Sequence, residues 1–220
     1  MKKNDGLKFL LDNFSNITVD TVFVNDFDSS KNELLLTNER QKYWRVRCGR
    51  KIGSELKLPM ASLYTIEELE RFIKYYKNKF NDMYFIVHRI DNDYFYPKIT
   101  GSLAVYNNSN IPKIVIELQE VTKEMLDNID IGKRPRDWDI SVCLQYDFLY
   151  KFPKVTFYKD INMDNLKTAI NTLYYIGIKI FDLYCQMNIY EPSYTRFNIY
   201  DDSSIILNDH RSQESFIKIE

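Results

Sequence analysis

The spacing of apolar residues predicts three helices. They are expected at about residues 7–14, 66–78 and 164–188. Thr65 and Glu68 form a capping-box pattern at the start of the second helix, and Asn162 or Asp164 can cap the third. The third helix is the longest and has a wide apolar stripe. Such a stripe is typical of a helix packed in the core, so we assign it no direct chemistry.

Period-two alternation and β-rich runs predict several strands between and after these helices. They are expected at about residues 19–27, 42–48, 83–89, 94–106, 113–119, 140–146, 155–158, 193–200 and 205–207. The Asn-rich break at 107–110 separates two of these runs and favours a hairpin. The pattern as a whole predicts an α+β fold, with a mixed or antiparallel sheet, flanking helices and the long C-terminal helix in the core.

The length of 220 residues allows one large domain or two small ones. No repeat or low-complexity linker marks a boundary. We expect a single domain, with two subdomains at about 1–82 and 83–220 as the finer division.

Composition narrows the classes of function. Hydrophobic residues make up 45% and aromatic residues 15%, so a substantial core is expected. Thirty basic and 31 acidic residues give a formal charge of -1, which favours neither nucleic acid nor an anionic membrane as partner. An anion site must therefore be local.

The three cysteines and the N-terminal segment point to a reduced, cytoplasmic protein. The cysteines are far apart, with no CxxC pair, which argues against a disulfide framework or a structural zinc site. No apolar window approaches the roughly 18 residues that a membrane span requires. We expect a cytoplasmic location and no membrane partner.

The densest positive charge lies at residues 40–57, with seven basic residues and one acid. Within it Arg45 and Arg47 alternate with apolar residues, so one face of the predicted strand presents arginines. Gly49 and Gly53 permit a ligand to approach the backbone closely. Two interpretations stay open: a strand that holds phosphate groups, or a solvated basic edge strand.

A second candidate site follows the long helix. Glu191 lies just beyond it, and the runs 193–200 and 205–207 can pair antiparallel, which would bring Asn208 and Asp209 near the level of Glu191. Carboxylate and amide oxygens of this kind are ligands for Mg²⁺. The alternative is that Glu191 is a polar residue at a helix end and Asp209 a turn former.

Other familiar sites are not indicated. His88 and His210 are the only histidines, and neither has the neighbours of a zinc motif. The chain has no GxSxG elbow, Walker loop or GxGxxG run.

Three short motifs resemble the nucleotide-binding domain of pyruvate phosphate dikinase and phosphoenolpyruvate synthase, an ATP-grasp relative. The motifs are Arg45-Val46-Arg47-Cys48-Gly49, Tyr190-Glu191-Pro192-Ser193-Tyr194 and Ile205-Ile206-Leu207-Asn208-Asp209-His210-Arg211. The first is similar to the family's serine-valine-arginine-serine strand. The second is similar to its acidic strand after a long helix. The third is similar to its final strand, with Asp209 in place of a glutamine and Arg211 matching an arginine.

The resemblance implies an ATP-grasp-like fold that binds ATP with Mg²⁺ and catalyses a phosphoryl-transfer or ligase-type reaction. By this match Arg47 is the equivalent of the arginine that contacts the nucleotide phosphates. We therefore expect Arg45 and Arg47 to hold phosphates and Glu191 and Asp209 to hold the metal. Arg211 is expected to be catalytic, because it neutralises charge on the transferred phosphoryl group. The central strands that face the nucleotide are expected to carry Lys98 or Glu117, although no motif assigns them.

Two alternatives remain. We expect neither the phosphohistidine domain nor the barrel domain of the family here, so the chain is expected either to act with a partner protein or to keep the fold as a non-enzymatic interaction module. Tyrosines are candidates for the partner surface, namely Tyr94, Tyr96, Tyr146 and Tyr150. Single-stranded nucleic acid bound across the arginine and tyrosine strands is the weaker third interpretation, because the net charge is close to zero.

Overall fold

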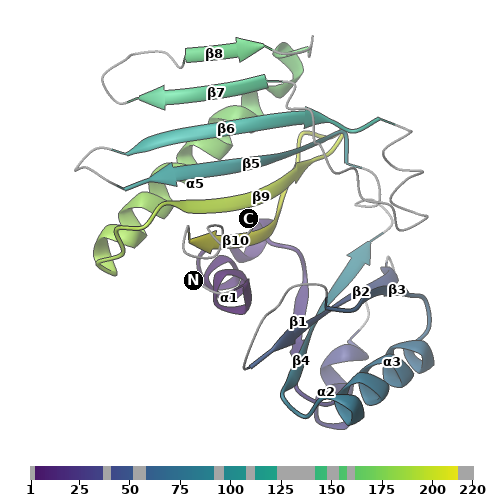
Figure 1. Cartoon of the computed structure of the whole chain (residues 1–220). Helices are drawn as coiled ribbons and strands as arrows, with labels where there is room; N and C mark the ends of the chain where they lie inside the picture. Colours follow the sequence, from purple (N-terminus) through teal and green to yellow (C-terminus); the bar gives the residue numbers. More distant parts are fainter. Residues whose placement is uncertain are drawn as a thin grey trace. The chain divides into compact units, whose positions relative to one another are not determined.

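The computed structural model describes residues 3–36, 41–51, 58–91, 97–107, 112–122, 142–147, 154–157 and 162–212. The chain divides into two compact units, which are Val19–Phe95 and Met1–Thr18 with Tyr96–Glu220 (Figure 1). A division at 82/83 would separate Met83–Asp91 from the strands it pairs with inside the first of these units. The subdomain bounds expected from the sequence, about 1–82 and 83–220, differ from this division and stay a prediction. The two units are described separately below.

The unit Val19–Phe95, called the small unit, is built on a four-stranded sheet with the order β1-β4-β2-β3. All its pairings are antiparallel. The strands are β1 (Thr21–Val24), β2 (Gln41–Arg50), β3 (Met60–Leu63) and β4 (Met83–Asp91). The longest strands, β2 and β4, form the centre, and the four-residue strands β1 and β3 form the edges.

Two helices, α2 (Phe27–Leu34) and α3 (Ile66–Lys79), pack on one face of this sheet through a shared apolar cluster. Val46 and Val87 belong to the cluster and are fully buried. The capping box of α3 is present, with the Thr65 side chain accepting from Glu68 N and the Glu68 carboxylate accepting from Thr65 N. The sequence therefore predicted the start of α3 correctly.

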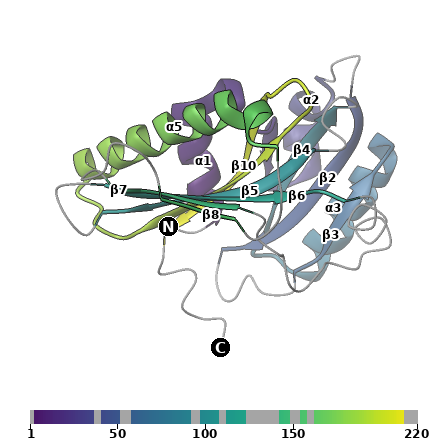
Figure 2. The same cartoon turned by 90° about the horizontal axis from the view of Figure 1, so that it is seen from above.

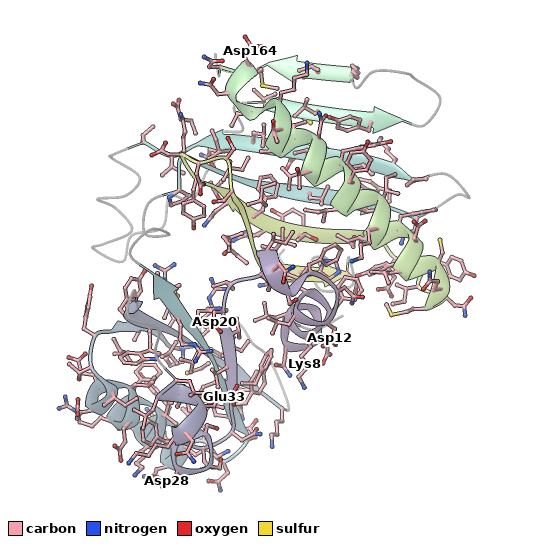
Figure 3. All side chains as sticks on the ribbon, turned by 180° about the vertical axis from the view of Figure 1, so that it is seen from behind. Lys8, Asp12, Asp20, Asp28, Glu33 and Asp164 are labelled. Atoms are coloured by element: carbon pink, nitrogen blue, oxygen red, sulfur yellow. The ribbon has the colours of Figure 1, made fainter. Side chains whose placement is uncertain are left out.

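A bidentate ion pair joins strand β4 to the segment before β1. Arg89 donates from Nε and Nη2 to the two carboxylate oxygens of Asp20, at 2.6 and 2.7 Å. Its Nη1 also donates to the backbone carbonyls of Glu33 and Leu36 at the end of α2. Asp20, Asp28 and Glu33 are labelled within this unit in Figure 3. Arg89 thus satisfies carbonyls that the end of a helix leaves unpaired.

The second unit, called the large unit, is built on a six-stranded antiparallel sheet with the order β10-β9-β5-β6-β7-β8. The strands are β5 (Ile99–Tyr106), β6 (Lys113–Glu120), β7 (Val142–Asp147), β8 (Lys154–Phe157), β9 (Ser193–Ile199) and β10 (Ile205–Ser212). The β5–β6 hairpin and the antiparallel β9–β10 pair confirm two pairings predicted from the sequence. Strand β9 joins the β5–β8 meander through β5, which brings the C-terminal residues beside the central strands.

Helices α1 (Lys3–Phe14) and α5 (Lys167–Gln186) both cover one face of this sheet (Figure 2). Gly6 allows α1 to approach β10, since a Cβ there would lie 1.8 Å from the carbonyl oxygen of His210. Gly177 of α5 faces Ile114 of β6 in the same way, with the nearest atom at 2.9 Å. The apolar stripe of α5 is buried, at about 1.5–3 kcal/mol for each large side chain. This confirms the core helix expected at the C-terminal end.

The predicted N-cap of the long helix needs correction. Neither Asn162 nor Asp164 caps α5, whose N-cap position is Leu166 with no side-chain hydrogen bond. Asp164 (labelled in Figure 3) instead begins a short 3₁₀ turn, Asp164–Leu166, and its N–H donates to Asn162 Oδ1 at 3.1 Å. The turn carries the chain into α5 without a side-chain cap.

Candidate functional site

A row of polar side chains crosses the face of the six-stranded sheet that is turned away from α1 and α5, which we call the distal face. Direct cross-strand partners lie on the same face of a sheet. Contacts with α5 fix the helix-covered face, because Tyr146 packs on Tyr174 with ring centroids 4.6 Å apart and Ile114 meets Gly177. The row on the distal face, read from β10 to β8, is Asp209, Arg196, Ser102, Glu117, Cys143 and Thr156.

Asp209 reaches the distal face because β10 contains an irregularity in its pairing. Leu207 pairs with Phe197 and Asp209 with Arg196, so Asn208 is the extra residue. Leu207 and Phe197 are on the helix-covered face, and without the extra residue Asp209 would point to that face too. The bulge therefore turns Asp209 and Arg211 to the distal face and places His210 between α1 and α5.

Asp209 and Arg211 form an ion pair within β10. The Arg211 Nε and Nη2 atoms both donate to Oδ2 of Asp209, at 3.1 and 2.7 Å. The Asp209 side chain is 8% exposed and that of Arg211 is 32% exposed. The carboxylate is thus held inside the protein by a neighbour two residues along the same strand, while the guanidinium keeps access to the solvent.

Arg196 lies directly opposite Asp209 in the register of β9 and β10. Its side chain is exposed, and it makes no ion pair with any residue that the structure describes. Asp209, Arg211 and Arg196 together carry −1, +1 and +1, a local sum of +1. Sequence reasoning did not single out Arg196, although the predicted alternation of 193–200 already placed it on a polar face.

The central part of the row is also polar. Ser102 Oγ donates to Oε2 of Glu117 at 2.6 Å, which fixes the Glu117 carboxylate over β5 and β6. Burial raises the pKa of the neighbouring Cys143 thiol, and the Glu117 carboxylate raises it further. Cys143 is therefore not an activated nucleophile. Glu117 lies on a central strand, as expected, and Lys98 precedes β5, where its Nζ is 3.9 Å from Asp201.

Glu191 does not lie at the level of Asp209. It precedes β9, and Asp209 is opposite Arg196, five residues further along the chain. Five extended residues correspond to roughly 16 Å. The backbone carbonyl of Glu191 accepts from Asn107 Nδ2 at 3.5 Å. The expected convergence of Glu191 with Asn208 and Asp209 was wrong, because the strands do pair antiparallel but Ser193 is opposite Ser212.

These positions bear on the predicted metal site. Among the described residues no three His, Cys, Asp or Glu side chains come together in a way that could hold a metal ion. A divalent cation on Asp209 would lie beside the guanidinium of Arg211, and a doubly charged ion 4 Å from a unit positive charge is repelled by roughly 8 kcal/mol at an effective dielectric constant of 20. The described residues do not fit a preformed Mg²⁺ site, and the metal roles of Glu191 and Asp209 stay predictions.

The predicted arginine strand is β2 of the small unit. Arg45 pairs with His88 and Ser62, out of phase with the β2 residues that pack against α2 and α3. Arg47 follows two residues later on the same face. Arg45 Nη2 donates to Tyr43 Oη at 3.1 Å, with its guanidinium 5.8 Å from the ring centroid. The structure therefore shows the expected division into an apolar face and a face with arginines.

Two other residues of this basic segment have structural roles. The Tyr84 ring packs on Gly49, and a Cβ added at Gly49 would lie 2.1 Å from Cζ of Tyr84. The space beside this glycine is thus filled by a side chain of the protein and not left open for a ligand. Arg50 forms a bidentate ion pair with Asp82, at 2.9 and 3.0 Å. Gly53 lies outside the described residues.

His210 is the centre of a buried network on the helix-covered face. Its Nδ1 is 2.7 Å from Thr195 Oγ1, and its Nε2 is 2.7 Å from Tyr184 Oη. Its ring stacks on Phe9 of α1, with centroids 4.7 Å apart. Burial lowers the pKa of His210 to about 3, with a smaller opposite effect from Asp209, and burial raises the pKa of Tyr184. The imidazole is neutral and links both helices to the sheet.

The comparisons with known proteins bear on the fold. No protein-family model matches the sequence, and no curated protein matches it. Among solved structures, the D-alanine-D-alanine ligase from Coxiella burnetii matches with a TM-score of 0.52 and 14% identity, covering 97% of this chain and 48% of that one. The fold is ATP-grasp-like.

Two further solved structures have lower scores. The L-amino acid ligase from Bacillus licheniformis matches with a TM-score of 0.49 and 8% identity, covering 96% of this chain and 42% of that one. The C-terminal domain of K. lactis Pby1, described as an ATP-grasp enzyme interacting with the mRNA decapping enzyme Dcp2, matches with a TM-score of 0.45 and 10% identity, covering 97% of this chain and 64% of that one. The chain spans less than half the length of the two ligases.

The ATP-grasp-like fold was predicted from the motif resemblance, and the neighbours do not single out the dikinase or the synthase. None of the helices in the described residues is long and apolar enough to cross a membrane.

Proposed function

We propose that this chain binds a nucleoside triphosphate such as ATP on the distal face of the six-stranded sheet. The observation that carries the proposal is the group formed by Asp209, Arg211 and Arg196. The Arg211 guanidinium is paired with the buried Asp209 carboxylate, and Arg196 is the exposed cross-strand partner of Asp209. A planar guanidinium matches the geometry of phosphate oxygens and is the side chain best suited to hold them. An ATP-grasp-like fold is a fitting context for such a group.

Arg211 is proposed to stabilise negative charge on the transferred phosphoryl group, and Arg196 to bind phosphate beside it. Both act by position and charge, as phosphoryl transfer requires little covalent chemistry from the protein. Within the small unit, Arg47 by its motif resemblance and Arg45 on the same face of β2 are proposed separately as phosphate ligands. We favour a ligase-type reaction over a dikinase-type transfer, because the ATP-grasp-like neighbour with the highest similarity score among those named above is a ligase.

ATP is the proposed cofactor, and Mg²⁺ would enter as the counter-ion of its phosphates. Mg²⁺ keeps several water ligands and is bound largely through substrate phosphates. It can then accompany the nucleotide without the carboxylate cluster that the sequence predicted. Nothing in this proposal requires Glu191 and Asp209 to share an ion.

Isothermal titration of the whole chain with ATP and Mg²⁺ tests the proposal. Saturable binding supports it, and the absence of binding at about 1 mM nucleotide would contradict it. A dissociation constant of 1 mM corresponds to a binding free energy of about −4 kcal/mol, and weaker binding is too low for a dedicated site. GTP and AMP serve as comparison ligands. A loss of affinity from ATP to AMP would show that the distal phosphates carry the interaction.

The alternative from the sequence is an interaction module that keeps the fold without catalysis. Of its candidate tyrosines, Tyr146 packs on Tyr174, and Tyr94, Tyr96 and Tyr150 lie outside the described residues. ATP binding without turnover of the nucleotide, in the presence of candidate amino-acid and carboxylate substrates, would favour this alternative over a ligase. A partner protein would then be the next object of search.

A further inference from the structure

The ion pair of Asp209 and Arg211 leaves donors free for a ligand. A guanidinium has five N–H bonds, and two of them, one on Nε and one on Nη2, point to the same Asp209 oxygen. Three N–H bonds therefore remain for another acceptor. Because the Arg211 side chain is 32% exposed, a ligand on the distal face can reach them.

The surroundings of this pair also favour an anion over a metal ion. Arg196, directly opposite Asp209, adds a second positive charge. The nearest carboxylate along the row is that of Glu117, which lies on β6 beyond both Arg196 and Ser102 and is hydrogen-bonded by Ser102. At a spacing of about 4.8 Å between strands, Glu117 is roughly 14 Å from Asp209 across the sheet. No second carboxylate among the described residues of this row stands next to Asp209.

We infer that the guanidinium of Arg211 takes the place of a protein-bound divalent cation, so that the polyphosphate of a nucleotide binds here without a metal ion on Asp209. The inference rests on the proposed function and deepens it. Asp209 then acts as a positioning residue, because its carboxylate accepts two hydrogen bonds from Arg211 and so holds the guanidinium in one orientation. Arg211 supplies a fixed positive charge where the sequence motifs suggested Mg²⁺.

The test compares ATP binding to the unaltered chain in excess EDTA and in excess Mg²⁺, by isothermal titration at constant ionic strength. We expect the two dissociation constants to agree within about threefold, because the protein's own cations supply the attraction in both cases. Binding in Mg²⁺ alone would overturn the inference while leaving the proposed nucleotide binding intact. Binding in neither condition would overturn both.

The Arg211→Asn variant provides a second measurement. It removes the fixed cation and leaves the Asp209 carboxylate beside an amide, both oxygen ligands that Mg²⁺ accepts. We expect ATP affinity in EDTA to fall by about tenfold or more, with part of the loss recovered in Mg²⁺. Equal affinity of this variant and the unaltered chain in EDTA would contradict the role of Arg211.

Lys167→Asn is the matched control, since Lys167 is an exposed cation at the start of α5 on the helix-covered side. It should bind ATP like the unaltered chain under both conditions.

Titration with Mn²⁺ in the absence of nucleotide is a third measurement. The unaltered chain should show no Mn²⁺ site at Asp209, and a site that Asp209→Asn abolishes would overturn the inference even if Arg211→Asn does not fold.

Discussion

The hydroxyl of Tyr184 lies 2.7 Å from Nε2 of His210, which joins the long helix α5 to the last strand β10 in the centre of the large unit. Both residues are 0% exposed, and Thr195 contacts the other ring nitrogen of His210. The same strand presents Asp209 and Arg211 to the distal face. The network that anchors β10 on one face therefore also fixes the charged group on the other.

Stability of the large unit should fall as the pH falls below about 6.5. His210 has a folded-state pKa of about 3 against an ordinary value of 6.5, so in acid the unfolded chain takes up a proton that the folded chain does not. The loss begins near pH 6.5 and continues toward pH 3. At pH 5 it amounts to about 2 kcal/mol. Urea unfolding followed by circular dichroism between pH 8 and pH 5 measures it.

The matched variant for this prediction is His210→Gln, which keeps polar atoms and cannot be protonated in this range. Its stability is lower at neutral pH, but its decline between pH 6.5 and pH 5 should be shallower than that of the unaltered chain. Identical slopes for the two proteins would mean that His210 is not the group responsible.

Tyr184→Phe should destabilise the chain by about 1–3 kcal/mol, because it leaves a buried ring nitrogen of His210 without its partner. Tyr175→Phe is the control, since it removes the same hydroxyl from the same helix at a position that is 71% exposed. The control should change stability by less than about 0.5 kcal/mol. Equal effects of the two substitutions in urea titrations would show that the buried hydrogen bond contributes nothing.

Gly6→Ala should be more damaging than Gly177→Ala. An alanine Cβ at Gly6 would lie 1.8 Å from a backbone oxygen of His210, so α1 or β10 must shift, at a cost of about 1–3 kcal/mol or more. At Gly177 the nearest atom is the Cδ1 end of the Ile114 side chain, at 2.9 Å, which can rotate away. Alanine also favours a helix over glycine by about 1 kcal/mol at both positions.

Thermal unfolding of the two glycine variants orders them directly. Gly177→Ala should remain within about 1 kcal/mol of the unaltered chain, and Gly6→Ala should melt well below it. The reverse order would mean that α1 is not held as close to β10 as the structure has it.

How far the sequence predicts the fold depends on the strength of each local pattern. The long stripe of α5 and the capping box of α3 are strong signals, and both elements were predicted. Helix α2 was missed, because only Phe27 and Leu34 are buried in its eight residues and the remainder is a polar run. Its one local signal was the N-cap Asp26, whose side chain accepts from Ser29 N. The short edge strand β3 was missed for a similar reason.

The candidate site was predicted in part, and the limit was the register. The sequence singled out Asp209 and Arg211 as site residues and the alternation of 193–200 as a strand. It contained no sign that Asn208 forms a bulge, and one residue of shift decides which face every later side chain occupies. The bulge shifts the register by one residue, so the pairing of Arg196 with Asp209 was not foreseen. The level of Glu191 was wrong for a different reason, because the register places Ser212 and not Asp209 opposite Ser193.

Arg196→Ala should reduce ATP affinity by about 10- to 100-fold, the equivalent of one charge-assisted hydrogen bond to phosphate. It should leave stability unchanged, because the Arg196 side chain is exposed and makes no ion pair with a described residue.

Arg50→Ala, the control variant, should behave in the opposite way. Its guanidinium is engaged by both oxygens of Asp82, so its removal weakens the small unit and spares nucleotide binding. Titration with ATP and urea unfolding of both variants separate the two roles. Equal losses of affinity would show that the effect is one of general positive charge, and would remove Arg196 from the site.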